Sequence, residues 1–369
     1  METVKKYCAA PWRGLHLNFN GQIKTCCASE SKLDTILGSN ELLEVKQSIK
    51  EGILHKEYCK GCIEREDAGG KSERDWHNNI SPDFDVHTAD LNEHTPSLID
   101  IRWTNTCNLA CTYCSSYFST KWASIIGVPN SNNINKKYQE VINYIDQHKE
   151  HVKEVALVGG EPLLMKENAK LLDILFENVL VTVISNMTVD FDRFPVPNKL
   201  LSRDRVGWSM SFDNIGKRFE YVRWGSTWEQ LNKNVTVVSN KINKSNHHGG
   251  IHAVYNLYNC TRLCELKEYA DLNNVNILWQ RISGDHLDPC LHNNRIKQLA
   301  LDEIEKYRHN FIISDSDKHF LDQTERSLVL DNRDYTQKFL DFTKDIETKW
   351  HPDQEGQFAK LWPEIAEAL

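Results

Sequence analysis

The clearest pattern in the chain is an alternation of apolar runs and amphipathic stretches that begins at about residue 97. Six runs rich in aliphatic, β-branched and aromatic residues predict strands at 97–104, 152–160, 179–185, 205–213, 251–259 and 275–282. Apolar residues at helical spacing predict helices between them at 138–150, 168–178, 227–242 and 263–274. Nearly continuous apolar strands that alternate with helices are typical of a parallel sheet covered on both faces. The pattern therefore predicts an α/β fold, and six such units favour an open, partial (β/α)6 TIM-like barrel.

The residues before and after this region follow other patterns. A helical stretch lies near 40–56, and Asn20-Gly21 predicts a hairpin with a tight primed turn. The polar segment 64–95 has no periodic pattern, which predicts irregular structure or a linker. The C-terminal residues are mostly helical in pattern. The expected organisation is a cysteine-rich N-terminal domain with linker over 1–95, a barrel over 96–285 and a helical extension over 286–369.

Composition and charge narrow the class of partner. The net charge of the 369 residues is −8, which argues against a basic surface for nucleic acid or anionic membrane. We find no apolar run of about 18 residues that would span a bilayer. The first residues lack the apolar core of a secretory signal. We therefore expect a cytoplasmic protein that needs no membrane and for which a nucleic-acid partner is disfavoured.

The eleven cysteines change this picture because they are clustered. In a reducing cytosol, clustered cysteines favour metal binding over disulfides. Cys107, Cys111 and Cys114 follow the spacing C-x3-C-x2-C directly after the first barrel strand, at the face where parallel barrels carry their chemistry. Three thiolates can hold three irons of a [4Fe–4S] cluster and leave the fourth iron open. A zinc site completed by a distant histidine, or simple core cysteines, are the alternatives.

The stretch CNLACTYC resembles the cluster motif of the radical SAM superfamily, including the aromatic Tyr113 before the last cysteine. The resemblance extends over roughly 97–285. It implies that S-adenosylmethionine (SAM) binds the open iron of a [4Fe–4S] cluster on Cys107, Cys111 and Cys114. It also implies the reaction: one electron from the cluster cleaves SAM, and the resulting 5′-deoxyadenosyl radical takes a hydrogen atom from the substrate.

The same resemblance implies contacts to SAM at the ends of the other strands. After the second strand comes a GGEP motif, in which Glu161 would accept the SAM ammonium group. Asn186 ends the third strand, and Met187 follows where relatives often carry glycine. The implied SAM contacts are Tyr113 for the adenine, Gly159, Gly160, Glu161 and Pro162 of the GGEP motif, Asn186, the set Ser209, Ser211 and Asp213 for the ribose and carboxylate, Arg223 for a carboxylate, and Asn256 for the nucleoside.

A second cysteine group precedes the barrel. Cys8, Cys26, Cys59 and Cys62 supply four thiolates, a closed set that suits zinc or an iron–sulfur cluster. Their spacing resembles the auxiliary-cluster segment of SPASM and twitch radical SAM enzymes, although in most of these the segment follows the barrel. The resemblance implies an auxiliary cluster, [4Fe–4S] in type, for electron transfer. Cys27 is either an alternate ligand or buried.

The remaining metal-binding residue types are not assigned to a site. Cys260, Cys264 and Cys290 are expected to be structural, because cysteine is among the most often buried residue types. The fifteen histidines show no spacing that requires a metal.

Relatives with SPASM or twitch segments mostly modify peptides or proteins. The resemblance therefore implies an oxygen-sensitive oxidoreductase that oxidises or cross-links a peptide, as a maturase of ribosomally made peptides (a RiPP maturase). A flavodoxin- or ferredoxin-type reductant would supply the electron. Two alternatives remain open: a zinc-stabilised, non-enzymatic α/β binding protein, and a radical SAM enzyme that activates another protein by making a glycyl radical.

Overall fold

The computed structural model describes residues 7–29, 39–67, 70–129, 138–282 and 284–369. The chain divides into two compact units, each assembled from three segments. The first unit comprises Met1–Thr106, Ser131–Ile184 and Pro195–Gly207, and the second comprises Cys107–Asn130, Ser185–Phe194 and Trp208–Leu369. The division at 106/107 falls immediately before the first cysteine of the C-x3-C-x2-C motif. The three domain boundaries expected from the sequence stay predictions.

Eight strands belong to the principal sheet, which is mostly parallel. All six predicted strands are present: β3 Leu98–Ile101, β5 Glu154–Leu157, β6 Leu180–Ser185, β7 Val206–Ser211, β9 His248–Tyr255 and β10 Asn276–Arg281. The other two, β1 Gly14–Leu17 and β2 Ile23–Lys24, come from the N-terminal segment. The α/β fold is thereby confirmed, while its description as a partial barrel stays a prediction.

Within the first unit the strand order is β6-β5-β3-β1-β2. The pairs β6–β5, β5–β3 and β3–β1 are parallel, and β1–β2 is antiparallel. Gly14 lies opposite Leu98, and Leu17 opposite Ile101. All four residues of β1 are buried, so the first strand of the cysteine-rich segment is an interior strand of the sheet.

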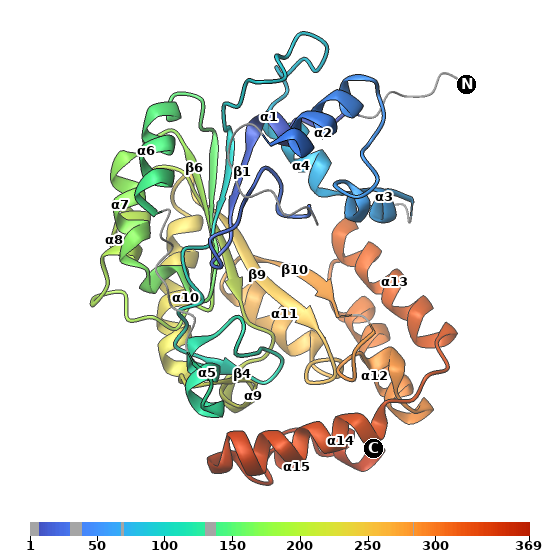
Figure 1. Ribbon diagram of the computed structural model, residues 1–369. Coiled ribbons are helices and arrows are strands. Elements are labelled where there is room, and N and C mark those ends of the chain that lie inside the picture. The colour runs from blue at the N-terminus through green and yellow to red at the C-terminus, as the bar shows by residue number, and fades with distance from the viewer. Residues whose placement is uncertain (1–6, 30–38, 68–69, 130–137, 283) are drawn as a thin grey trace. The chain divides into compact units, whose positions relative to one another are not determined.

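The helices of the first unit include those predicted near 40–56, at 138–150 and at 168–178. These helices are α1 Ala10–Arg13, α2 Asn40–Lys50, α3 Lys60–Asp67, α4 Glu73–Ile80, α6 Tyr138–His148, α7 Lys166–Ile174 and α8 Pro195–Ser202, with a short 3-10 helix at Pro162–Leu164. Figure 1 shows α6, α7 and α8 on the same side of β6, and α7 packs against α8. The expectation of irregular structure over 64–95 is wrong in part. Helix α4 lies there because Ser72 and Asp75 form a capping box at its start.

The hairpin between β1 and β2 is present, but its turn differs from the prediction. The backbone N–H of Gly21 donates to the carbonyl of Asn18 at 2.9 Å, and Gly21 has a φ of 85°. Among the described residues other than glycine, only Met187 and Asn274 have a positive φ, so Asn20 does not. The tight primed turn is therefore wrong, and a longer loop with one left-handed glycine replaces it. Asn18 and Asn20 favour this loop because each side-chain oxygen accepts a nearby backbone N–H.

The second unit contains most of β7, together with β9 and β10, which pair in parallel. It also contains a small antiparallel sheet of β4 Ala110–Cys111 and β8 Arg223–Trp224, which the hydrophobic pattern does not predict. Figure 1 shows β4 close to α5 and α9. The helices before the C-terminal region are α5 Thr120–Ile126, α9 Gly216–Val222, α10 Trp228–Ile242 and α11 Leu263–Leu272.

The C-terminal region is mostly helical, as predicted. It contains α12 Asn294–Asn310, α13 Asp315–Leu330, α14 Thr336–Asp345, a π-helix at Ile346–Trp350, α15 Gln357–Leu361 and α16 Pro363–Ala368, with 3-10 turns at Pro289–Leu291 and Pro352–Gln354. Tyr258 anchors this region, because its ring contacts Phe339, Phe358 and Trp362. None of the helices in the described ranges combines the length and the apolar character needed to cross a membrane.

Candidate functional site

The three cysteines of the C-x3-C-x2-C motif lie in one loop of the second unit, with Cys111 on β4. Cys111 is buried, whereas Cys107 and Cys114 are half-buried. The backbone N–H of Cys114 donates to the carbonyl of Cys111 at 2.9 Å, which closes the second half of the loop. The pKa of Cys111 is raised to about 12 and that of Cys114 to about 11, in each case mainly by burial and in part by a neighbouring cysteine. These thiols are therefore neutral at pH 7 unless a bound cationic group stabilises their thiolates.

The start of helix α5 holds this loop in place. Ser119 caps the helix and also donates its hydroxyl to the carbonyl of Leu109 at 2.6 Å. Thr120 Oγ1 accepts the N–H of Cys107 at 3.1 Å, and the indole N–H of Trp122 donates to the carbonyl of Cys111 at 2.8 Å. Sequence reasoning missed these three residues. The helix-start pattern Ser-Thr five positions after the last cysteine is the signal that could have found them.

Three of the predicted SAM contacts, Tyr113, Asp213 and Arg223, lie together in the second unit. The Tyr113 hydroxyl donates to Asp213 Oδ2, and Arg223 Nη2 forms an ion pair with the same oxygen at 3.1 Å. The centre of the guanidinium lies 5.5 Å from the centre of the Tyr113 ring, a cation–π distance. Asp213 Oδ1 accepts the backbone N–H of Val254 at 2.7 Å. Each carboxylate oxygen of Asp213 is therefore bonded to a group of the protein.

Asn186 and Met187 lie next to the first cysteine of the motif. Asn186 Nδ2 is 3.8 Å from Cys107 Sγ and 3.0 Å from Asn108 Oδ1. Met187 is fully buried and has a φ of 60°, the left-handed conformation that glycine adopts most easily. Asn234 stabilises this turn by donating to the Met187 carbonyl at 2.8 Å. The chain thus keeps a glycine-like backbone at the position where the motif departs from its relatives.

The other predicted SAM contacts of the second unit have different surroundings. Ser209 and Ser211 alternate with buried residues along β7, and both are half-buried. The Ser209 hydroxyl lies 3.3 Å from Nδ1 of His252, whose Nε2 lies 2.9 Å from Gln280 Oε1. Asn256 is fully buried, and its side chain bonds to backbone groups of Val254 and Tyr258. The structure therefore gives Asn256 a role in shaping the loop after β9.

The GGEP motif belongs to the first unit. Gly159 has a φ of 125°, and a Cβ atom at Gly160 would lie 2.4 Å from the carbonyl oxygen of Thr106. Glu161 is fully buried, and its Oε1 accepts the N–H of Leu163 at 3.0 Å, so it caps the 3-10 helix that Pro162 begins. Both glycines are required by close approach of backbone, which is a structural reason for the motif in addition to the predicted contact with SAM.

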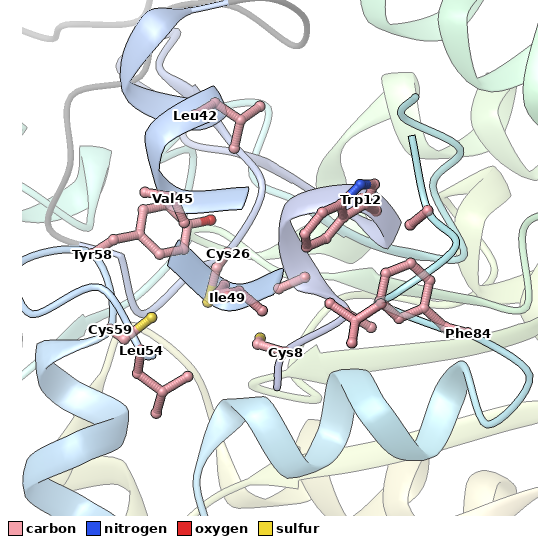
Figure 2. Packing of buried hydrophobic residues seen from close by; sticks show 14 residues of the cluster. Cys8, Trp12, Cys26, Leu42, Val45, Ile49, Leu54, Tyr58, Cys59 and Phe84 are labelled. Carbon is pink, nitrogen blue, oxygen red and sulfur yellow. The ribbon is translucent and has the colours of Figure 1, made fainter. Parts of the chain in front are cut away.

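Cys8, Cys26, Cys59 and Cys62 are all buried in the first unit. Cys8, Cys26 and Cys59 belong to one hydrophobic cluster with residues of α1 and α2, and Figure 2 shows their sulfur atoms turned toward the middle of that cluster. The pKa of Cys8 is raised above its usual range and that of Cys59 to about 11, in each case mainly by burial and in part by Cys62. Arg74 lowers both. The fold therefore brings cysteines from three separate segments near one another.

Cys26 and Cys27 both line a small cavity with His16, His77 and Asp100, next to Trp76. Nδ1 of His16 is 3.2 Å from Asp100 Oδ2. Burial lowers the pKa of His77 to about 4. Only Cys26 of the adjacent pair belongs to the hydrophobic cluster of Cys8 and Cys59, which favours Cys26 as the ligand of the N-terminal set.

The third cysteine group is buried, as expected for structural residues. Cys260 Sγ contacts the carbonyl of Leu257 at 3.5 Å, and the backbone N–H groups of Cys264 and Cys290 donate to Glu303 and Asp288. Across the described ranges, no three side chains of His, Cys, Asp or Glu are arranged to hold a single metal ion.

Comparison with known proteins gives a family match and distant structural likenesses. The model of the family described as "Radical SAM superfamily" matches residues 101–201. No curated protein matches the chain. Among solved structures, Streptococcus suis SuiB bound to S-adenosylmethionine is 17% identical, with a TM-score of 0.40, over 52% of this chain and 41% of that chain. The anSMEcpe protein with bound AdoMet and Kp18Cys peptide is 14% identical, with a TM-score of 0.41, over 58% of this chain and 60% of that one.

The same SuiB protein bound to its precursor peptide SuiA is 14% identical to this chain, with a TM-score of 0.41. That match covers 68% of this chain and 60% of the SuiB chain. The chain thus spans less than two thirds of the length of each of these solved proteins.

Proposed function

We propose that this chain is a radical SAM enzyme that cleaves SAM reductively at a [4Fe–4S] cluster held by Cys107, Cys111 and Cys114, and the family match over residues 101–201 supports this proposal. When bound, the cluster would supply the electron that splits the sulfonium of SAM into methionine and a 5′-deoxyadenosyl radical. The observation that carries the proposal is the loop of three cysteines inside the segment that matches the family. Three thiols and no fourth in that loop suit a cluster with one iron left for SAM.

The residues of the loop fit such a group chemically. Sulfur is the donor that iron–sulfur clusters use, and all three cysteines belong to one short loop braced by hydrogen bonds. Cys114 contributes to the raised pKa of Cys111, and Cys107 contributes to that of Cys114, because neighbouring thiolates repel one another. A bound iron cluster would offset that repulsion. Glu161 would orient the amino group of SAM, and Ser209 and Ser211 are the candidates for its sugar.

An auxiliary [4Fe–4S] cluster on Cys8, Cys26, Cys59 and Cys62 is the second part of the proposal. Four buried cysteines would, as thiolates, need compensation by a metal group, and neighbouring cysteines contribute to the raised pKa of Cys8 and of Cys59. A cluster with four protein ligands has no open iron, which favours electron transfer over substrate binding. It would accept the electron that the substrate radical loses when it is oxidised to the product.

The substrate class that we propose is a peptide or protein, oxidised or cross-linked as in RiPP maturation. The support is the resemblance of the N-terminal cysteine spacing to SPASM and twitch segments. A flavodoxin- or ferredoxin-type protein would be the reductant.

The test replaces Cys107, Cys111 and Cys114 together by alanine. After anaerobic reconstitution with iron and sulfide, we expect the wild type to hold about eight irons and to release 5′-deoxyadenosine from SAM with dithionite. The triple variant should lose about four irons and all 5′-deoxyadenosine formation, while its N-terminal cluster remains. Continued 5′-deoxyadenosine formation in the variant would contradict the proposal.

Metal analysis separates the alternatives. About two zincs and no iron in protein purified without oxygen would favour the zinc-stabilised binding protein. Formation of a glycyl radical on a partner, with no change to a peptide, would favour the activating enzyme.

A further inference from the structure

The side chain of Arg223 lies across a strand pair from the middle cysteine of the motif. In the antiparallel ladder of β4 and β8, Arg223 is the direct partner of Cys111, and Trp224 is the partner of Ala110. The N–H of Thr112 donates to the carbonyl of Val222 at 2.8 Å, which continues the pairing by one more bond. The cysteine loop is therefore joined by backbone to the one segment that carries Arg223.

Arg223 and Asp213 form an ion pair that is almost wholly removed from water. The side chains are 8% and 0% exposed, with Nη2 and Oδ2 3.1 Å apart. Taking two charges out of water carries a large desolvation cost, so a buried ion pair is weak evidence for a role in stability alone. Its place beside the cysteine loop calls for another reason.

Both charges contact Tyr113, the residue that directly precedes the last cysteine of the motif. The Tyr113 hydroxyl bonds to Asp213, and the guanidinium lies over the Tyr113 ring. Among the described residues, the buried Nε of Arg223 has no hydrogen-bond partner, so one strong donor remains for a further acceptor.

We infer that Tyr113, Asp213 and Arg223 form a buried charged brace that fixes the cysteine loop and sets the reduction potential of the cluster bound there. The inference rests on the proposed function. It gives these three residues a positioning role in place of the direct SAM contacts that the sequence suggests. Asp213 Oδ2 and the hydroxyl of Tyr113 already bond within the brace, and Asp213 Oδ1 accepts the backbone N–H of Val254.

The charges of the brace predict the direction in which each substitution shifts the reduction potential of the cluster. Reduction adds one negative charge to a cluster, so a nearby positive charge raises its potential and a nearby negative charge lowers it. R223M removes the cation and leaves the carboxylate of Asp213 buried without its ion-pair partner. D213N removes the anion and leaves the guanidinium uncompensated. The two single variants should therefore shift the potential in opposite directions, and the double variant R223M/D213N should return toward the wild type.

The experiment is a redox titration of the anaerobically reconstituted protein, with the reduced cluster followed by electron paramagnetic resonance. The N-terminal cysteines are replaced by alanine in every sample, so that the signal comes from one cluster. At the wild-type midpoint we expect R223M to show at least a tenfold lower ratio of reduced to oxidised cluster, which is about 59 mV for one electron. D213N should show a higher ratio. The matched control, R218M/E265Q, removes a partly exposed ion pair of the same unit and should leave the ratio unchanged.

Further variants test the inference if an unpaired buried charge prevents R223M or D213N from folding. R223K retains the positive charge, so its reduction potential should lie close to that of the wild type. R223Q lacks the charge and should have a lower reduction potential. In the apoprotein, Y113F should accelerate hydrogen exchange at the Thr112 amide, because one anchor of the loop is gone. Shifts of the same sign in R223M and D213N, or equal potentials for R223K and R223Q, would overturn the inference. A wild type that assembles no cluster would instead refute the proposed function.

Discussion

Protonation of a single buried histidine should account for a measurable part of the acid sensitivity of the first unit. His94 is buried, with Nε2 2.8 Å from the carbonyl oxygen of Gly14 and Nδ1 2.7 Å from the hydroxyl of Tyr144. Because a carbonyl can only accept, the neutral ring carries its proton on Nε2. Burial lowers the pKa of His94 from 6.5 to about 4.

The sign and size of the effect follow from proton linkage. The unfolded chain takes up this proton near pH 6.5 and the folded chain only near pH 4, so the folded state loses stability as the pH falls between these values. The loss is about 1.8 kcal/mol between pH 7 and pH 5, and about 3.4 kcal/mol in full below pH 4. That is a large share of the net stability of a typical domain, which is about 5–15 kcal/mol.

The perturbation is H94Q, which keeps one donor and one acceptor but cannot be protonated. The free energy of unfolding is measured by urea titration with tryptophan fluorescence at pH 7, 6 and 5. We expect the variant to be less stable at pH 7 but to lose about 1.8 kcal/mol less than the wild type on going to pH 5. H151Q, at an exposed histidine, is the control and should follow the wild type. If the free energy of unfolding fell equally in H94Q and in the wild type between pH 7 and pH 5, the predicted contribution of His94 would be wrong.

Two other predictions concern the candidate site. G160A places a Cβ 2.4 Å from the Thr106 carbonyl oxygen, so we expect it to destabilise the protein by about 1–3 kcal/mol in urea unfolding and to weaken SAM binding in equilibrium dialysis; wild-type affinity for SAM would contradict the assigned role of the motif. In the apoprotein, iodoacetamide followed by peptide mass spectrometry should label Cys107 and Cys114 before Cys111, because Cys111 is buried and its pKa is raised to about 12. Reconstitution with iron and sulfide should protect all three, and earlier labelling of Cys111 would show that the loop is open in solution.

Local sequence signals were sufficient for most of the secondary structure. The six strands of 97–282 and their helices were predicted because each depends on periodicity within a few residues. The errors came where short polar signals decide the conformation. Helix α4 depends on the cap formed by Ser72 and Asp75, and the loop after β1 depends on the side chains of Asn18 and Asn20.

The small sheet of β4 and β8 could not be predicted in this way. Each strand is two residues long, and 111 pairs with 223 across more than a hundred positions of the chain. The same is true of β1, whose place beside β3 depends on register between distant segments. Hydrophobic periodicity states that a strand is buried, but it does not choose the neighbour.

The amino-acid sequence alone was enough to predict the α/β class, the succession of strands and helices along the chain from 97 to 282, and the three cysteines of the loop, because these depend on spacing along the chain. The tertiary structure was needed to show that Tyr113, Asp213 and Arg223 bond to one another, that Met187 adopts a glycine-like turn, and that Cys26 rather than Cys27 belongs to the hydrophobic cluster of Cys8 and Cys59. The physical reason is that a side chain's partners depend on strand register, and a shift of one residue would turn each side chain to the opposite face of the sheet.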